Sequence, residues 1–321
     1  MVPAAKSILT PLIRSARYYC KGKPFSRTLH SSTIEHRQST LTDIYKLYNA
    51  NCPISVITAH DFISGAIADD SEKVDMILIG DSLSMTAKGY RSTLEIPFDE
   101  YIYACKSVMR GVNNKFVIAD MPFGSVESSD EKCIESAVKI MSIGKIGSVK
   151  IEGGKEMAPR IKRLNELGIP VTGHIGLQPQ KFNFFGGYKA QGKQACGAQK
   201  IYQDALALQE AGCQMIVLEC VPHKISKYIT EHLEVPTIGI GCGNGTSGQV
   251  LVFADLLGML DAKTGKFVKK YMNFHNDAVA ALNSYGADVK SSKFPENAQN
   301  GFHISEDEYS EFLELASKVK P

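Results

Sequence analysis

The stretch Ser148-Val149-Lys150-Ile151-Glu152-Gly153-Gly154 places two opposite charges inside a short apolar run that ends on paired glycines. We interpret it as a buried β-strand that leads into a turn. Side chains alternate between the two faces of a strand, so we expect Lys150 and Glu152 on one face and Val149 and Ile151 on the other. An ordinary apolar core would impose a large desolvation penalty on both charges. The stretch therefore indicates either a polar site at the end of a strand or a buried Lys–Glu pair with a structural role.

Similar short apolar runs, each followed by turn residues and a helical pattern, recur along the chain. They cover residues 54–58, 76–79, 116–119, 148–151, 170–173, 215–218, 236–240 and 255–258. Continuous apolar strands that alternate with helices are typical of a parallel sheet covered on both faces. With an opening helix near residue 40, they predict an α/β fold, a (β/α)8 TIM barrel over residues 39–296, close to the roughly 250 residues usual for this fold. A doubly wound open sheet is the alternative, but the first run, which ends Thr58-Ala59-His60-Asp61, lacks the glycine-rich turn of that fold.

Four of the predicted strands end on an acidic residue. These residues are Asp81, Asp120, Glu152 and Glu219, and successive members are separated by 39, 32 and 67 positions. One strand–helix unit of a TIM barrel occupies roughly 31 residues, so the spacing places the acids after strands 2, 3, 4 and 6. Because the carboxyl ends of parallel strands meet at one mouth of a barrel, we expect the four carboxylates to converge where barrel active sites lie.

Carboxylates without His or Cys companions favour a hard cation with oxygen ligands, such as Mg²⁺. We therefore predict a metal site at Asp81, Asp120 and Glu152, with open positions for a bidentate 2-oxo acid. Lys150 would balance the negative charge of that substrate, and Glu219 would act as a base on the carbon next to the carbonyl. Strand-end acids also cap helices, which is the alternative for Asp81 and Asp120.

Other features are compatible with function or with structure alone. Ser82 carries either a ligand-facing hydroxyl or a helix N-cap. His174 is expected to point inward with Thr172, where it would bind substrate or belong to the core. Residues 184–192 (Phe-Phe-Gly-Gly-Tyr-Lys-Ala-Gln-Gly) form either a lid over the site or a plain surface loop. The glycine-rich stretch 239–246 would bind a phosphate or allow close backbone packing.

The composition is that of a globular protein with a substantial core, with 44% hydrophobic and 22% charged residues. A formal net charge of +2 does not suggest a nucleic-acid partner. No apolar run reaches the roughly 18 residues of a membrane-spanning helix. The eight cysteines are scattered without a C-x-x-C pair, which predicts reduced, mostly structural thiols and not a zinc site or a disulfide framework.

The two ends of the chain differ in composition from the barrel region. Residues 1–38 are basic and rich in Ser and Thr, and their first acidic residue is Glu35. This composition predicts a mitochondrial transit peptide and hence a mitochondrial matrix location; a disordered basic tail without a targeting role is the alternative. Residues 297–321 are predicted to form a polar tail with a helix over 306–319, which packs on the barrel or on a neighbouring subunit.

Seven motifs follow one another in order over residues 40–295. They are Gly80-Asp81-Ser82-Leu83, Ala119-Asp120-Met121-Pro122-Phe123, Val149-Lys150-Ile151-Glu152-Gly153-Gly154, Gly173-His174-Ile175-Gly176-Leu177-Gln178-Pro179-Gln180, Phe185-Gly186-Gly187-Tyr188-Lys189, Leu218-Glu219-Cys220-Val221-Pro222 and Ile238-Gly239-Ile240-Gly241. Together they resemble the ketopantoate hydroxymethyltransferase (3-methyl-2-oxobutanoate hydroxymethyltransferase) family.

The resemblance implies a TIM barrel related to the phosphoenolpyruvate/pyruvate-binding enzymes, often assembled as a homo-oligomer, a decamer. It also implies a Mg²⁺-dependent reaction in which 5,10-methylenetetrahydrofolate donates a hydroxymethyl group to 3-methyl-2-oxobutanoate. The product is 2-dehydropantoate, an early intermediate of pantothenate and coenzyme A biosynthesis. By motif, the resemblance assigns metal contact to Asp81, Asp120 and Glu152 and the proton acceptor to Glu219. The residues that it assigns to 2-oxo acid binding are Asp81, Ser82, Asp120 and Lys150.

The chain departs from the usual family pattern at three positions. His60 stands where Tyr is frequent, Cys242 where Ala is usual, and Gly265 where Pro is common. A histidine near the substrate would introduce a pH dependence that Tyr would not. From the residues alone, two other functions stay open: a lyase or phosphotransferase acting on a phosphorylated 2-oxo acid, and a non-catalytic barrel scaffold.

Overall fold

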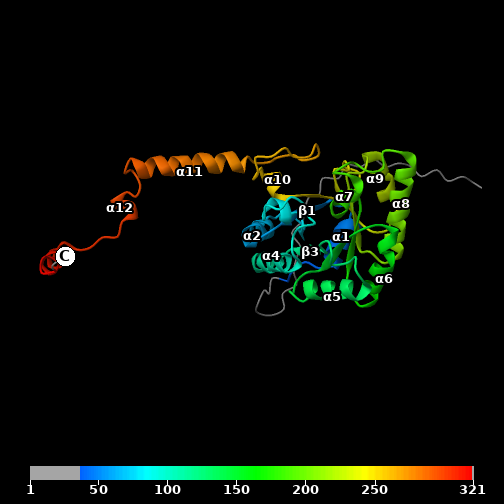
Figure 1. The fold of residues 1–321 in the computed structure, drawn as a ribbon, viewed down its shortest axis with the longest axis horizontal. Coiled ribbons are helices and arrows are strands. Elements are labelled where there is room, and N and C mark those ends of the chain that lie inside the picture. Colours follow the sequence, from blue (N-terminus) through cyan, green and yellow to red (C-terminus); the bar gives the residue numbers. More distant parts are fainter. Residues whose placement is uncertain (1–36, 320–321) are drawn as a thin grey trace, which may run out of the picture.

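The chain folds into a closed barrel of eight parallel strands (Figure 1). The computed structural model describes residues 37–319, so nearly all of the predicted targeting segment lies outside the described residues. Each strand is hydrogen-bonded to the next in sequence order, and the last pairs with the first. The strands are β1 (Ile54–Ala59), β2 (Met76–Ile79), β3 (Phe116–Asp120), β4 (Ser148–Glu152), β5 (Val171–Gly176), β6 (Met215–Glu219), β7 (Thr237–Ile240) and β8 (Gly248–Leu251).

Helices connect successive strands except β7 and β8 and cover the outside of the barrel, which confirms the predicted (β/α)8 architecture. The helices up to the last strand are α1 (Leu41–Asn49), α2 (Phe62–Asp70), α3 (Leu83–Thr86), α4 (Phe98–Gly111), α5 (Asp130–Met141), η1 (Lys155–Met157), α6 (Ala158–Glu166), η2 (Pro179–Lys181), α7 (Phe182–Phe185), α8 (Ala195–Glu210) and α9 (His223–Glu231). Those beyond β8 are α10 (Phe253–Leu257), α11 (Phe274–Lys290), α12 (Asn297–Asn300) and α13 (Glu306–Ser317).

The predicted eighth strand is wrong. Residues 255–258 lie at the end of α10, and the strand that closes the barrel is β8, seven residues earlier. Residues 250–260 are almost all apolar, and hydrophobicity alone does not separate a short strand from a helical turn in such a run. The close approach of β8 to β1 requires Gly248, because a Cβ there would collide with the carbonyl oxygen of Ile54. Helix α10 then ends at Gly258, which adopts the left-handed conformation.

Apolar side chains form two layers, one inside the barrel and one between the strands and the helices. The inner layer includes Met76 and Phe116, and Ile44 of α1 is buried in the same cluster. The hydroxyl of Tyr45 on α1 also donates a hydrogen bond, 2.8 Å long, to the carbonyl of Gln214 just before β6. Helix α1 therefore closes the N-terminal end of the barrel and leaves the opposite end open.

Strand β4 shows the alternation that its sequence predicts. Val149 and Ile151 are fully buried in the outer layer, between the strand and the helices. Lys150 and Glu152 face the interior of the barrel and line a pocket at its open end. The prediction of two chemically different faces is confirmed.

Beyond α10 the chain leaves the barrel. Figure 1 shows α11 extending away from it, with α12 and α13 farther out. No residue of these three helices is buried. The predicted C-terminal helix is present as α13, two residues shorter than expected, but it does not pack on the barrel of its own chain. Within residues 37–319, no helix has both the length and the apolar character needed to cross a membrane.

Candidate active site

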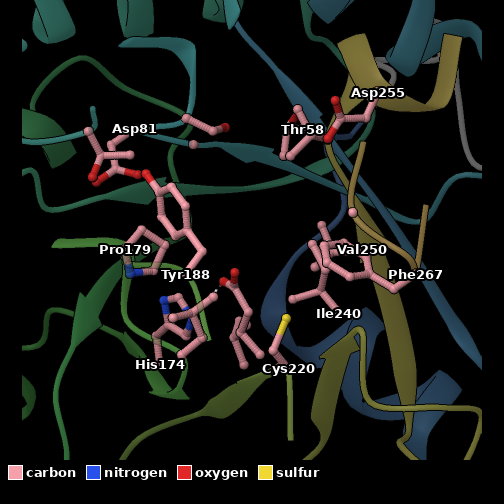
Figure 2. Close-up of a pocket in the computed structure, with 18 of the residues that line it drawn as sticks. Thr58, Asp81, His174, Pro179, Tyr188, Cys220, Ile240, Val250, Asp255 and Phe267 are labelled. Atoms are coloured by element: carbon pink, nitrogen blue, oxygen red, sulfur yellow. Dashed lines mark ion pairs between the residues drawn. The ribbon is translucent and has the colours of Figure 1, made fainter. Parts of the chain in front are cut away.

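The open, C-terminal end of the barrel holds a pocket of about 520 Å³ (Figure 2). Asp120, Glu152 and Glu219 are the last residues of β3, β4 and β6, and Asp81 follows β2 by two residues. Because all these strands run in the same direction, their ends deliver the four carboxylates to one mouth. The structure brings every sequence-predicted site residue to the pocket wall: Asp81, Ser82, Asp120, Lys150, Glu152, His174 and Glu219.

Lys150 pairs with Asp120 across neighbouring strands. Its Nζ lies 2.9 Å from Oδ1 of Asp120, and both side chains are almost fully buried. The other oxygen of Asp120 accepts a 2.8 Å hydrogen bond from the backbone N–H of Asp81. Nζ of Lys150 also lies 3.1 Å from Nδ1 of His174. The alternative in which Lys150 and Glu152 contact only each other is therefore wrong, because Lys150 belongs to a larger charged cluster.

His174 on β5 connects two of the carboxylates. Its Nδ1 lies 3.3 Å from Oε1 of Glu152, and its Nε2 lies 3.1 Å from Oε2 of Glu219. Burial and then the charge of Lys150 lower the pKa of His174, but the charge of Glu152 and the contacts with both glutamates outweigh them and raise it to about 9. The contact of Nε2 with Oε2 orients the imidazole and Glu219 toward each other.

The crowding of carboxylates also shifts the pKa values of the other charged side chains in the cluster. Burial first, and then the charges of Asp120 and Glu152, raise the pKa of Asp81 well above its ordinary value. Burial also raises the pKa of Glu152, but His174 and Lys150 outweigh it and lower that pKa overall. Burial opposes the charged form of Lys150, yet the neighbouring carboxylates raise its pKa. The cluster is thus rich in negative charge and favours a further cation.

Sequence reasoning missed Gln180, a buried residue of η2. Its Nε2 donates hydrogen bonds to Oδ2 of Asp81 (2.8 Å) and to the carbonyl of Met121 (3.0 Å). Its backbone N–H donates to Oε2 of Glu152 (3.0 Å). The residue ends one of the motifs quoted above, but nothing in its spacing shows that the segment after β5 reaches back over the ends of β2 and β4.

The donor set fits a hard divalent cation. Oδ1 of Asp120 and Oε1 of Glu152 are buried, and within residues 37–319 their contacts with Lys150 and His174 are ion pairs without hydrogen-bond geometry. The acidic groups offer only oxygen ligands. In the described part of the chain, no three His, Cys, Asp or Glu side chains converge in a metal-binding arrangement. The carboxylates are directed at Lys150, His174 and Gln180, so a cation there requires them to exchange those partners.

The contacts show the local roles of three further residues. Ser82 precedes α3, but its hydroxyl forms no N-cap hydrogen bond and instead lines the pocket. Asp61 does cap a helix, since Oδ1 accepts a 2.8 Å hydrogen bond from the backbone N–H of Ser64. His60 packs edge-to-face on Phe253 and is not among the residues that line the pocket.

Two loops reach the same end of the barrel. In the glycine-rich stretch after β7, a Cβ at Gly243 would lie only 2.6 Å from Cβ of His223, so this glycine allows close packing. In the predicted lid, residues 184–192, Tyr188 and Lys189 line the pocket. The Tyr188 hydroxyl lies 3.6 Å from the sulfur of Met85, across the mouth from its own loop.

A closed (β/α)8 barrel with four carboxylates, a lysine and a histidine at its C-terminal mouth defines a TIM-barrel enzyme with a carboxylate-rich active site. Comparison with known proteins identifies the enzyme family. The chain belongs to the ketopantoate hydroxymethyltransferase family, whose sequence model matches residues 38–297.

Relatives named 3-methyl-2-oxobutanoate hydroxymethyltransferase are similar over most of the chain. The relative from Emericella nidulans is 46% identical over 285 residues, which cover 88% of this chain and 81% of the relative. That from Saccharomyces cerevisiae is 43% identical over 284 residues, covering 86% and 91%. A bacterial relative from Oleidesulfovibrio alaskensis is 41% identical over 287 residues, covering 89% and 98%. This similarity supports assignment of the chain as an enzyme of that class.

Solved structures share the fold at low sequence identity. Phosphonopyruvate hydrolase in complex with oxalate and Mg²⁺ has a TM-score of 0.54 at 10% identity, covering 87% of this chain and 96% of that one. A 2,3-dimethylmalate lyase of the PEP mutase/isocitrate lyase superfamily has a TM-score of 0.53 at 12% identity, covering 88% and 96%. At this level of identity, the similarities show the shared barrel fold.

Proposed function

We propose that this enzyme transfers a hydroxymethyl group from 5,10-methylenetetrahydrofolate to 3-methyl-2-oxobutanoate. The product is 2-dehydropantoate, for pantothenate and coenzyme A biosynthesis. Family membership and the names of the relatives support the reaction. The pocket of about 520 Å³, with its charged cluster at one side, supports binding of a small 2-oxo acid.

The observation that carries this proposal is the position of Glu219. Its side chain is 16% exposed, whereas those of Asp120 and Glu152 are 3% and 2% exposed. Glu219 is therefore the carboxylate of the cluster best placed to reach a substrate carbon. The contact of Oε2 with His174 orients the group and leaves Oε1 to accept the proton from the β-carbon of the 2-oxo acid.

The remaining site residues bind the metal ion and the substrate and neutralise the substrate's negative charge. Asp81, Asp120 and Glu152 would hold Mg²⁺, and a bound Mg²⁺ supplies the Lewis acidity that makes the β-proton removable near neutral pH. Lys150 places a positive charge beside the substrate carboxylate, and Ser82 offers it a hydroxyl. After proton removal, the β-carbon attacks the methylene carbon of the donor and one of its two C–N bonds breaks. Water then supplies the hydroxyl oxygen as the second C–N bond breaks, and the two donor nitrogens take up the proton from the β-carbon and a proton from water.

Hydrogen exchange in D₂O tests the proton-transfer step. With Mg²⁺ and 3-methyl-2-oxobutanoate but no folate, the enzyme is expected to exchange the β-hydrogen for deuterium. Glu219→Gln should slow the exchange by about 100-fold or more, in the range usual for a lost general base, while still binding the 2-oxo acid. Glu210→Gln, at the exposed end of α8, is the matched control and should exchange at the wild-type rate. Normal exchange by Glu219→Gln would show that the base is misassigned.

Calorimetric titration tests the metal assignment. If the 2-oxo acid completes the coordination of Mg²⁺, each ligand should bind more tightly in the presence of the other, by the same factor. Asp120→Asn should weaken Mg²⁺ binding in the titration whether or not the variant is active. Equal Mg²⁺ affinity with and without the 2-oxo acid would contradict a shared site.

We further propose a mitochondrial matrix location and a homo-oligomeric state. The basic, acid-poor composition of residues 1–38 supports the location. The unburied apolar side chains of α11 support the oligomer. Fusion of residues 1–38 to a fluorescent protein tests the first proposal, and fluorescence that stays outside mitochondria would contradict it.

A further inference from the structure

The residues with roles in the proposed reaction line one side of the pocket, and the residues of the opposite side have no role in it. Figure 2 shows Asp81 and His174 on one side, and Asp255, Val250 and Phe267 across the pocket from them. The second side is formed by the ends of β7 and β8, by α10 and by the segment that follows α10. Its apolar side chains are Ile240, Val250, Val252 and Phe267, and its polar ones are Asp255, Lys263, Thr264 and Lys266.

Asp255 is an unpartnered carboxylate in this second wall. It is half-buried, and no hydrogen bond or ion pair joins its carboxylate to another of residues 37–319. Burial raises the pKa of Asp255. The positive charge of Lys270 lowers that pKa by a smaller amount, so it stays above its ordinary value. A half-buried carboxylate between apolar side chains is complemented by a flat ligand that presents N–H donors along one edge.

A second cavity, of about 850 Å³, adjoins the pocket on this side. Its lining includes three basic residues, Lys193, His223 and Lys266, and no Asp or Glu. None of these three side chains forms an ion pair within the described part of the chain. The cavity therefore favours an anionic ligand. The residues that line both cavities are Ala190, Cys220, Lys266 and Phe267.

We propose that the two adjoining cavities bind the one-carbon donor, with the N–H edge of its reduced pterin ring on Asp255 and its glutamate carboxylates against Lys266 and Lys193. This inference rests on the proposed function, which supplies a folate as the donor. The ring packs against Phe267, whose side chain is 39% exposed. Cys220 lines both cavities and directly follows the base Glu219, so a ligand spanning the two cavities passes beside the reacting carbon.

Separate measurement of the two half-reactions tests the role of Asp255. Asp255→Asn keeps the size of the side chain and removes the charge that accepts from two donors. The KM for 5,10-methylenetetrahydrofolate should rise about tenfold or more, as for one lost hydrogen bond to a charged group. Exchange of the β-hydrogen in D₂O without folate should stay within about twofold of wild type, which also shows that the variant is folded. Asp261→Asn, an exposed acid in the same segment, is the matched control and should change neither quantity.

Two outcomes would overturn the assignment of Asp255. An unchanged KM for the donor would show that its ring does not contact Asp255. An equal loss of β-hydrogen exchange would place Asp255 with the 2-oxo acid. Wild-type enzyme that neither exchanges nor transfers would refute the proposed function itself, so the two failures are distinguishable.

A second variant tests the anionic end of the donor and leaves Asp255 itself in place. The wild-type enzyme is expected to have a lower KM for a donor with several glutamates than for one with a single glutamate. Joint replacement of Lys193 and Lys266 by Ala should reduce this preference by about threefold or more. Lys162→Ala, on the exposed face of α6, should retain it. If the double variant keeps its preference for the donor with several glutamates, the glutamate carboxylates do not bind at Lys193 and Lys266.

Discussion

At the residue scale, the candidate site depends on groups that lie between the charged residues. Gln180 holds Asp81 through its side chain and Glu152 through its backbone. His174 similarly lies between Glu152 and Glu219. In a buried cluster such neutral or bridging groups set the orientation of each carboxylate, because every unpaired oxygen there carries a desolvation penalty.

Gln180→Leu is predicted to destabilise the fold. The substitution keeps the backbone N–H but leaves Oδ2 of Asp81 and the carbonyl of Met121 buried without this donor. The free energy of unfolding should fall by about 1–3 kcal/mol, measured by urea denaturation. Gln199→Leu, at an exposed position of α8, should change it by less than about 0.5 kcal/mol. Equal effects of the two substitutions would contradict this account.

The pair Glu156–Lys181, outside the pocket, predicts a pH dependence of stability. Its oxygen and nitrogen lie 2.6 Å apart, and both side chains are partly exposed. Burial raises the pKa of Glu156, but hydrogen bonds with Lys181 and the backbone lower it overall, to about 2. The folded-state pKa lies below the unfolded-state value, so this stabilisation is complete above the unfolded-state pKa and is lost as the pH falls toward 2.

Glu156→Gln should therefore lower the free energy of unfolding near neutral pH, by less than about 1 kcal/mol because the pair is screened by solvent. The difference from wild type should shrink as the pH falls from about 4.5 toward 2. Urea denaturation at several pH values measures it. A difference that does not vary over this range would assign the effect to packing and not to charge.

At the element scale, the pairing of β5 with β6 sets the distance between His174 and Glu219. Gly176 lies opposite Glu219 in the register of the two strands. It has a φ of +93°, and a Cβ there would collide with the carbonyl oxygen of Glu219. The same carbonyl accepts a 2.8 Å hydrogen bond from the backbone N–H of Leu177. A glycine at this position therefore allows the two strand ends to approach closely enough for the imidazole to reach the carboxylate.

Gly176→Ala is predicted to lower the free energy of unfolding by about 2–5 kcal/mol, through both the left-handed backbone and the collision with β6. The matched control is Gly168→Ala, with a φ of +81° and no atom within 4 Å of an added Cβ. The free energy of unfolding of Gly168→Ala should fall by only about 1–2 kcal/mol, because this variant has only the unfavourable backbone conformation. If both variants lose similar amounts of unfolding free energy and of activity, then β6 accommodates the added methyl group without a collision.

At the scale of the whole molecule, the C-terminal helices lack a partner within their own chain. Leu282, Tyr285 and Val289 follow one another at helical spacing along α11 and are 68%, 57% and 44% exposed. After β8, only the five-residue helix α10 covers the barrel before the chain departs (Figure 1). An exposed apolar stripe of this length is typical of a contact with another subunit.

The proposed homo-oligomer predicts a molar mass in solution that is a multiple of the 35.1 kDa chain, measured by light scattering. Leu282→Glu should shift the mass toward smaller species, because a charge would enter the contact. Asn283→Glu, the next residue on the same helix, is the matched control and should leave the mass unchanged. A monomeric wild-type protein would refute the proposal.

The sequence by itself determined the number of strand–helix units and the four strand-end acids. Both depend on local regularities, namely the apolar runs and the spacing of about one unit between Asp81, Asp120 and Glu152. Only the tertiary structure decided where β8 lies, which carboxylate pairs with Lys150, and that Gln180 joins the site across 99 residues of chain. These features depend on distances between side chains of different strands. Closure of the barrel sets those distances, and no pattern within one segment contains them. For the stretch 148–154, the sequence predicted two charges on one face, and the barrel directed Lys150 to Asp120 and Glu152 to His174.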